Sequence, residues 1–235
     1  IVRRRHRTVF RLKALLARPR LDQRAVHREV LFGQEPLLTG LLEDGGREVA
    51  IQPQLASTFG LHVRRKVYVP ADGYMARYLE VLTNSTAQPI TVDVQIQSFL
   101  GSDSNTRVVA TSSGDTTFAT DDLWLVTDDD AGTSPHPGSD PTLAHVIGGP
   151  GAVMAVGLAT RASDVLTYRW IGVTVPAGGR AIIMHFAAQH FTQPQSIAVA
   201  ERLVQLPPEA MAGLSPEEIR DVVNFAIPAD GSSPL

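Results

Sequence analysis

Alternating apolar and polar side chains from Leu61 onward constrain the fold of this chain more than any other feature of its sequence. Successive side chains of a β-strand point to opposite faces, so a period of two predicts one apolar face and one solvated face. The apolar row is Leu61, Val63, Val67 and Val69, and the polar row is His62, Arg64, Lys66 and Tyr68. Arg65 interrupts the apolar row, and we expect it near an edge of the sheet.

Two further strands follow at short intervals. Residues 70–73 (PADG) form a turn, because proline fixes φ and glycine accepts a positive φ. Residues 74–83 are apolar on both faces, as in a buried strand, and residues 90–97 alternate regularly. Consecutive strands joined by short connections predict an antiparallel β-sandwich, so the expected fold class is mainly β.

The rest of the chain indicates the same class and ends in a short C-terminal helical segment. Apolar residues at helical spacing between 196 and 206, and a capping box from Ser215 to Glu218, predict two helices. Further strand-like segments are 37–42, 47–52, 106–111, 123–127, 144–147, 152–158, 165–175 and 180–189. The expected division is 1–30 (basic arm or linker), 31–192 (β-sandwich domain), 193–228 (helical segment) and 229–235 (tail).

Length and composition limit the possible classes of protein. A chain of 235 residues is long enough for a substantial core. It has no cysteine, which excludes disulfides and thiolate chemistry, and no apolar run long enough for a transmembrane helix. The sequence begins at Ile1 rather than Met and shows no signal-peptide pattern, so we expect a fragment or a processed chain.

Positive charge is concentrated in residues 1–30, which hold ten of the 21 lysines and arginines and two of the 24 acids. The acidic remainder argues against nucleic-acid binding by the main domain. Within the arm, Val9, Leu12, Leu15 and Leu16 lie at helical spacing. Three interpretations stay open: an arm that binds an anionic partner, a linker or docking segment against an acidic surface of the same assembly, or a stretch that does not represent the native protein.

Aspartates in the predicted loops form the candidate metal site. Calcium takes about six to eight oxygen ligands, which clustered carboxylates and backbone carbonyls can supply. The candidate ligands are Asp121, Asp122, Asp128, Asp129 and Asp130. Their spacing does not match the helix–loop–helix calcium pattern, and solvated turn aspartates are the alternative interpretation.

The sequence contains no motif for nucleophilic, zinc or phosphate chemistry. Strand geometry places His185 and His190 on opposite faces, so we expect a hydrogen-bonded structural histidine rather than a histidine pair. Several aromatic side chains could stack on a sugar: Tyr68, Tyr74, Tyr78, Trp124, Tyr168 and Trp170. Tyr68 is the candidate ligand-binding residue, because it lies on the polar face of its strand, and core packing explains the others equally well. No catalytic residue is identified, and we expect that the chain is not an enzyme.

The runs LHVRRKVYVPADGYMARYLEVLTNSTAQPITVDVQIQSFLGSD and VTVPAGGRAIIMHFAAQ resemble β-sandwich modules of large bacterial secreted and surface proteins, and also supersandwich domains of carbohydrate-active enzymes. The resemblance covers residues 43–189 and consists of fold motifs. Together with the absence of a catalytic motif and the long turn-rich loops, it favours a non-catalytic extracellular or cell-surface module with a structural, adhesive or assembly role. The loop aspartates make calcium the candidate cofactor. The partners of such a module would be other subunits, copies of itself or a glycan. The alternative is a carbohydrate-binding module or the sandwich domain of a carbohydrate-active enzyme, and a third hypothesis is a protein that binds an anionic polymer through its basic arm.

Overall fold

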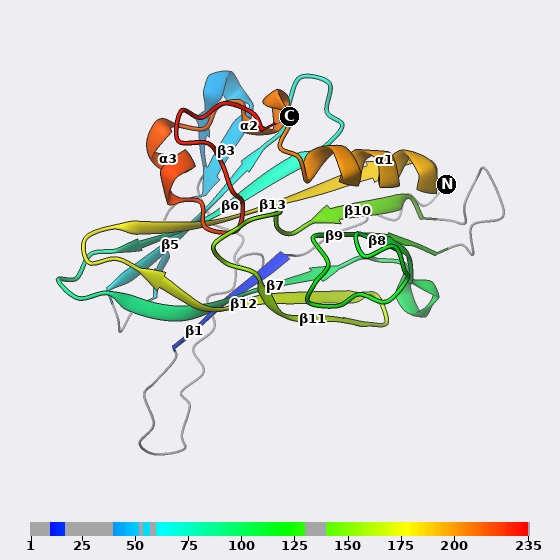
Figure 1. Cartoon of the computed structure of the whole chain (residues 1–235), viewed down its shortest axis with the longest axis horizontal. Helices are drawn as coiled ribbons and strands as arrows, with labels where there is room; N and C mark the ends of the chain where they lie inside the picture. The colour runs from blue at the N-terminus through cyan, green and yellow to red at the C-terminus, as the bar shows by residue number, and fades with distance from the viewer. Residues whose placement is uncertain (1–9, 17–39, 52–53, 57–59, 130–139, 235) are drawn as a thin grey trace, which may run out of the picture.

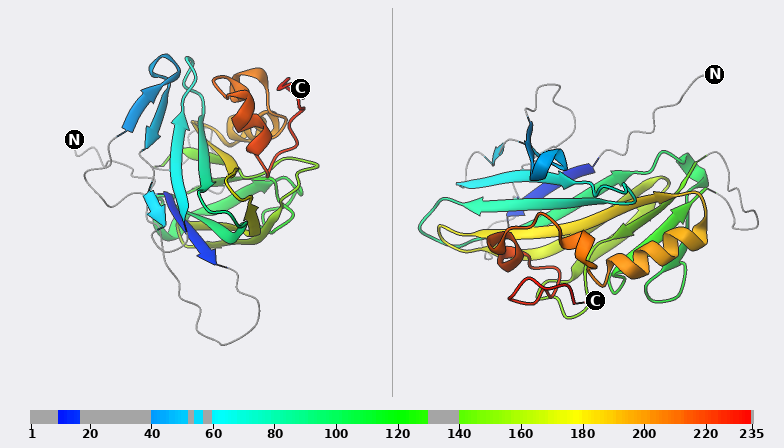
Figure 2. Two further views of the ribbon diagram at one scale, coloured as in Figure 1. Left: turned by 90° about the vertical axis from the view of Figure 1, so that its left-hand side faces the viewer. Right: turned by 90° about the horizontal axis from the view of Figure 1, so that it is seen from above.

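The computed structural model describes residues 10–16, 40–51, 54–56, 60–129 and 140–234. They form three layers: a four-stranded sheet, a nine-stranded sheet packed against it, and a helical layer on the outer face of the larger sheet (Figures 1 and 2). The prediction of a mainly β, antiparallel sandwich with a short C-terminal helical segment is therefore confirmed.

Both sheets are antiparallel throughout their strand ladders. The smaller sheet has the order β1 (Phe10–Leu16), β7 (Ile90–Phe99), β12 (Val165–Val175) and β11 (Val156–Ala162). The larger sheet has the order β2 (Gly40–Glu43), β3 (Glu48–Ile51), β5 (Leu61–Tyr68), β6 (Ala76–Asn84), β13 (Arg180–His190), β10 (Thr142–Val146), β9 (Trp124–Asp128) and β8 (Arg107–Thr111), with β4 (Gln54–Ala56) paired to β5. Short 3-10 turns span Asp44–Gly46 and Asp103–Asn105.

Alternation along the central strands divides the apolar side chains between two cores. On β13, Ile183 packs in the sandwich core, between the sheets. Its neighbours Ile182, Met184 and Phe186 pack in the helix core, between the larger sheet and the helices. Both faces of β6 and β13 are therefore buried, which explains why their sequences show no solvated row.

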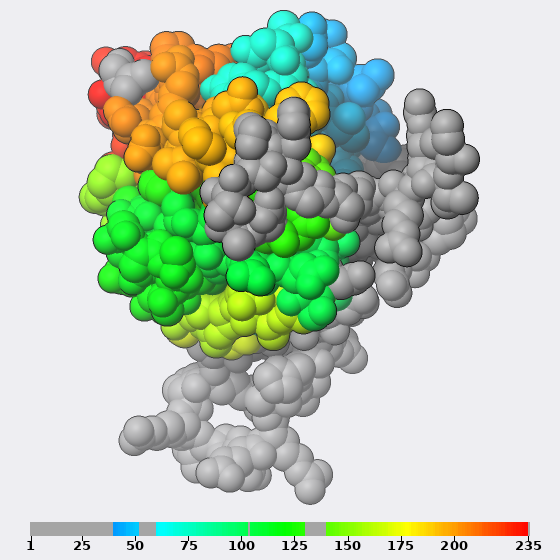
Figure 3. Space-filling model, turned by 90° about the vertical axis from the view of Figure 1, so that its right-hand side faces the viewer, coloured from blue at the N-terminus to red at the C-terminus, as the bar shows by residue number. Residues whose placement is uncertain are grey.

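The helical layer consists of α1 (Gln193–Leu203), α2 (Pro208–Met211) and α3 (Pro216–Asp221). The side chain of Thr192 caps α1, and the predicted capping box of Ser215 and Glu218 is present at the start of α3. In Figure 3 the helical segment, in orange, covers the upper part of the face above the green strands. None of the helices in the described ranges is long and apolar enough to cross a membrane.

Asn224 fastens the segment after α3 to the larger sheet. Its side-chain amide donates to the carbonyl oxygens of Ile147 at 3.0 Å and Met184 at 2.6 Å, and its Oδ1 accepts from the Met184 N–H at 2.9 Å. A side chain on Gly149 would meet the Phe225 ring at 2.6 Å, so glycine is required for this close approach. The buried main chain of β13 therefore gains partners from the C-terminal segment.

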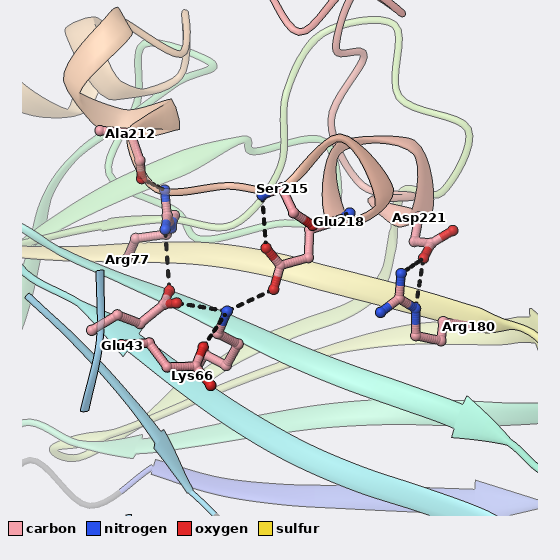
Figure 4. A network of polar contacts seen from close by, with 9 residues as sticks. Glu43, Lys66, Arg77, Arg180, Ala212, Ser215, Glu218 and Asp221 are labelled. Carbon is pink, nitrogen blue, oxygen red and sulfur yellow. Dashed lines mark hydrogen bonds and ion pairs between the residues drawn. The ribbon is translucent and has the colours of Figure 1, made fainter. Parts of the chain in front are cut away.

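A buried ionic network joins the helical layer to β5 and β6 (Figure 4). Lys66 Nζ contacts Glu48 at 2.6 Å, Glu218 at 2.7 Å and Glu43 at 3.0 Å. The Arg77 guanidinium donates to the carbonyl oxygens of Ala210 at 2.9 Å and Ala212 at 2.7 Å, and to Glu48 at 3.2 Å. The carboxylates raise the pKa of Lys66 despite the opposing effect of burial, so the amine stays charged.

Two sequence-based expectations about placement are wrong. Residues 10–16 form a strand rather than a helix, because their backbone pairs with β7 from Phe10 opposite Ser98 to Leu16 opposite Val92. Arg65 does not lie near a sheet edge: it is 5% exposed, since β5 has neighbours on both sides. Its charge is balanced by a residue of the adjacent strand, as described below.

Replacing Arg77 with methionine should reduce the free energy of unfolding by about 3–5 kcal/mol, the usual cost of breaking a buried ion pair. The change removes the two bonds to the α2 segment and leaves Glu48 without one of its cations. Urea unfolding measures the loss. The matched control is Arg107→Met on the exposed edge strand β8, where we expect a change below about 0.5 kcal/mol. Equal effects of the two variants would contradict the anchoring role of Arg77.

Candidate functional site

A pocket of about 260 Å³ lies at the end of the larger sheet where β6, β10 and β13 meet, and we call it the rim pocket. Its lining includes Tyr74, Ala76, Tyr78, Leu143, Ala187 and Gln189. None of the described residues that line it carries a charge. A small concave site with aromatic walls and few polar groups is the usual form of a pocket for a small neutral ligand.

Tyr78 connects the rim pocket to the sandwich core. Its ring stacks on the imidazole of His185, with centroids 4.9 Å apart and planes inclined by 12°. The two residues are direct cross-strand partners on β6 and β13, which accounts for the stacking. The guanidinium carbon of Arg65 lies 5.9 Å from the same ring centroid. These contacts fix the orientation of the Tyr78 ring at the wall of the pocket.

A cluster of polar side chains is buried in the sandwich core behind Tyr78. Arg65 Nη2 contacts Glu80 Oε1 at 2.6 Å, with 6% and 0% of the two side chains exposed. His185 Nε2 lies 3.1 Å from the same carboxylate oxygen, and the Tyr168 hydroxyl lies 3.3 Å from His185 Nδ1. A buried carboxylate is tolerated only when it is paired and hydrogen-bonded, and Arg65 and His185 supply both conditions for Glu80.

The directions in which the pKa values of Glu80 and His185 are shifted indicate the charge of each side chain. Burial alone would raise the pKa of Glu80, but Arg65 and His185 outweigh it and lower the pKa, so Glu80 is a carboxylate. Burial lowers the pKa of His185 despite the opposing effect of Glu80, so the imidazole is neutral. The neutral ring carries its proton on Nε2 and donates it to Glu80, while Nδ1 accepts from Tyr168.

A carboxylate beside an imidazole is a pair of groups that can carry out acid–base chemistry. Glu80 and His185 are each 0% exposed, however, and neither lines the rim pocket. In this arrangement they cannot touch a molecule bound there. Their role is to balance Arg65 and to hold the Tyr78 ring, which is the member of the group that reaches the pocket.

His145, on β10, is a second imidazole in the sandwich core. It is 1% exposed, and neither ring nitrogen has a hydrogen-bond partner among the described residues. Burial, with a smaller effect of His185, lowers its pKa from 6.5 to about 4. His145 is therefore neutral at physiological pH and makes the core sensitive to acid.

The aspartates predicted as calcium ligands lie in different surroundings. Asp122 accepts hydrogen bonds from the N–H groups of Ser113 at 3.1 Å and Ala119 at 2.9 Å. Asp128 accepts from Thr142 at 2.8 Å and from Gln193 at 3.0 Å.

Of the other candidates, Asp121 is exposed, Asp129 is half-buried and Asp130 lies outside the described residues. Within the ranges that the structure describes, no three acidic or histidine side chains gather as a metal site. Calcium binding stays a prediction from the sequence.

Tyr68, the predicted glycan-stacking residue, lies in the helix core at 6% exposure. The guanidinium carbon of Arg77 lies 4.6 Å from its ring centroid. The predicted polar face of β5 is covered by the helical layer, so the Tyr68 ring packs instead of facing solvent. The aromatic residues at the rim pocket are Tyr74 and Tyr78.

The sequence reasoning did not identify Glu80, and it preferred Tyr68 to Tyr74 and Tyr78 as the sugar-stacking residue. The sequence does contain a signal for the buried ion pair of Arg65 and Glu80. Glu80 interrupts a strand that is apolar on both faces, and Arg65 interrupts the apolar row of the preceding strand. The short turn at 70–73 sets their register, in which Arg65 lies opposite Glu80. Two opposite charges that break the pattern of adjacent hairpin strands indicate a buried ion pair. His185 is a hydrogen-bonded core histidine, as expected.

Comparison with known proteins gives similarities in structure only. No family model and no curated protein matches the sequence. A galactose mutarotase-like protein from Lactobacillus casei ATCC 334 aligns over 78% of this chain and 85% of its own, with 10% identity and a TM-score of 0.44. A proposed aldose 1-epimerase from Klebsiella pneumoniae aligns over 77% and 58%, with 12% identity and a TM-score of 0.37. A galactose mutarotase related enzyme from Lactobacillus acidophilus aligns over 66% and 72%, with 7% identity and a TM-score of 0.37.

These comparisons correct two expectations from the sequence. The similar structures are described as mutarotase-like, epimerase and mutarotase-related proteins, whereas we expected a non-catalytic extracellular module with a structural, adhesive or assembly role. That main expectation, and the expectation that the chain is not an enzyme, are therefore withdrawn. The alternative, a carbohydrate-related sandwich domain, is closer to what was found. The resemblance to sandwich domains holds at the level of the fold, which the two packed antiparallel sheets show.

The stability of the protein should fall as the pH is lowered from about 6.5 to about 4. A histidine whose pKa is lowered in the folded state binds a proton more readily when the chain is unfolded. The free energy of unfolding is therefore unaffected by this histidine above pH 6.5, and it decreases as the pH falls from 6.5 toward the pKa of about 4 in the folded protein. For His145 the loss amounts to about 3 kcal/mol. Urea unfolding at several pH values between 7 and 4 measures it.

The variant His145→Leu should remove that part of the pH dependence and fold stably at pH 7, because neither ring nitrogen has a partner among the described residues. Some acid sensitivity should persist, since the pKa of His185 is also lowered by burial. Half-exposed His62, changed to leucine, is the matched control for the loss of a histidine outside the core. An unchanged profile in the His145 variant would show that this residue does not titrate as described.

Proposed function

We propose that this chain is the sandwich domain of a carbohydrate-active protein and that a sugar binds in the rim pocket. The observation that carries the proposal is the composition of the pocket wall. Two tyrosines, Tyr74 and Tyr78, and Gln189 are among the residues that line a volume of about 260 Å³. Aromatic rings pack against the apolar C–H faces of pyranoses, and an amide can bond hydroxyl groups.

The uncharged lining favours a neutral ligand over a phosphorylated or acidic one. Burying a charged group without a partner costs several kcal/mol, and the described lining residues offer no counter-ion. The fixed orientation of Tyr78 reduces the entropy lost on binding, because its ring is already held by His185. Galactose and other aldoses are tested first, since the structurally similar proteins are described by these sugars.

The proposal predicts that partly filling the pocket weakens sugar binding. Ala187 lines the rim pocket, and Ala187→Leu should occupy part of its volume. Saturation-transfer NMR with galactose, glucose and a panel of neutral oligosaccharides measures binding. Polarimetry of freshly dissolved α-anomers in the same samples shows whether binding is accompanied by interconversion of the anomers.

We expect the unaltered chain to bind the sugar. The affinity measured by NMR should be at least tenfold weaker for Ala187→Leu and unchanged for Ala162→Leu. The control lies on β11, where Ala162 is exposed and remote from the pocket. Thermal unfolding confirms that both variants fold, and Ala76→Leu provides a second way to fill the pocket. Failure of every neutral sugar to bind the unaltered chain would refute the proposal, as would equal binding by the filled variants.

Calcium binding, an extracellular or cell-surface location and association with other subunits or copies of the chain stay predictions from the sequence. The rim pocket does not depend on any of them.

A further inference from the structure

The helical layer contacts Tyr74, a residue that lines the rim pocket, through Glu209 and Arg202, which do not line it. We call these three side chains the rim triad. Tyr74 lines the pocket just before β6 begins, and its hydroxyl donates to Glu209 Oε1 at 2.9 Å. Arg202, in the last turn of α1, donates to the same oxygen from Nε at 2.9 Å and from Nη2 at 2.7 Å. One carboxylate oxygen therefore receives three donors from two different layers.

The main chain around Glu209 is itself held in place. Arg77 donates to the carbonyl oxygens of Ala210 and Ala212, on the C-terminal side of Glu209. On its N-terminal side, Leu206 has a φ of 52°, and two prolines follow with fixed φ angles. Because a leucine in this region is uncommon and costly, the turn before α2 is set by the surrounding structure. The main chain that carries Glu209 is therefore held in place by the surrounding structure.

We propose that the C-terminal helical segment controls ligand binding in the rim pocket by fixing the Tyr74 ring through Glu209 and Arg202. Tyr74 is then a specificity-determining residue, and Glu209 and Arg202 are positioning residues. This inference rests on the proposed sugar-binding function and adds both a mode of recognition and a source of control.

Fixing the hydroxyl determines what Tyr74 offers to a ligand. Its O–H is directed to Glu209, so the residue contributes ring surface to the pocket more than a hydrogen-bond donor. A pyranose presents a rigid apolar patch of C–H groups that can pack on such a surface. An open-chain polyol with the same hydroxyl groups has no such patch and must also lose internal rotations on binding. The rim triad therefore favours cyclic sugars over open-chain polyols.

The test compares Glu209→Ala with a matched control, Glu217→Ala, which removes a glutamate of an exposed pair with Arg220 on α3. Affinities are measured for a pyranose and for sorbitol. The Tyr74 phenol is followed directly by NMR of the chain labelled with carbon-13 at tyrosine Cζ, since the protein has four tyrosines and Tyr74→Phe assigns the signal. Burial and then Glu209 raise the pKa of the Tyr74 phenol above its usual value.

In Glu209→Ala we expect the dissociation constant for the pyranose to rise about two- to tenfold, as for a side chain that must be immobilised on binding. The preference for the pyranose over sorbitol should shrink, and the pKa of the Tyr74 phenol should fall toward its ordinary value. Tyr74→Phe should weaken binding to a similar extent, and Tyr74→Ala should weaken it more because the ring is lost. Glu217→Ala should change none of these quantities.

The outcomes separate this inference from the proposed function. If the unaltered chain binds no pyranose, both fail. If it binds a pyranose and Glu209→Ala binds equally well, the sugar site stands and control by the helical segment is refuted. A weaker affinity with an unmoved Tyr74 signal would also overturn the inference, because the coupling would not pass through Tyr74.

Discussion

Burial of β6 and β13 on both faces is the constraint on which the rest of the structure depends. One face of each strand lies in the sandwich core and the other in the helix core. Any polar side chain on these strands must therefore find a partner inside the protein. Arg77 is paired with Glu48 and two carbonyl oxygens, and Glu80 with Arg65 and His185. The ionic groups on the two sides of the sheet are thus two solutions to the same requirement.

Most of the fold could be predicted from the sequence because its strands follow local rules. The hairpin from β5 to β6, the alternation of β7, the full extent of β12 and the capping box of α3 all depend on neighbouring residues. The failures concern long-range contacts. Residues 10–16 have a helical spacing of leucines, but pairing with β7, far along the chain, makes them a strand. Local preference is a weak guide where a distant partner supplies the hydrogen bonds.

The candidate site was harder to predict, and for the same reason. The alternation in β5 identifies two faces but cannot show that a helical layer from residues 193–221 covers the polar one. Tyr68 was therefore expected in solvent and lies in a core, while Tyr74 and Tyr78, for which core packing was an equally good explanation, line the pocket. Glu209 belongs to a four-residue helix whose sequence says nothing about a tyrosine 135 positions earlier. Such residues are found only when the layers are assembled.

The position of β13 has a consequence for synthesis of the chain. It is the last strand to emerge, yet it lies between β6 and β10, pairing Arg180 with Thr83 and His190 with Thr142. Until it arrives, both neighbours expose unpaired edges, which can template association with other chains. Closure over so long a sequence separation is also slow. A ribosome stalled before residue 180 would thus display two open sheet fragments, and residues 180–190 decide whether the preceding three-quarters of the polypeptide escape aggregation.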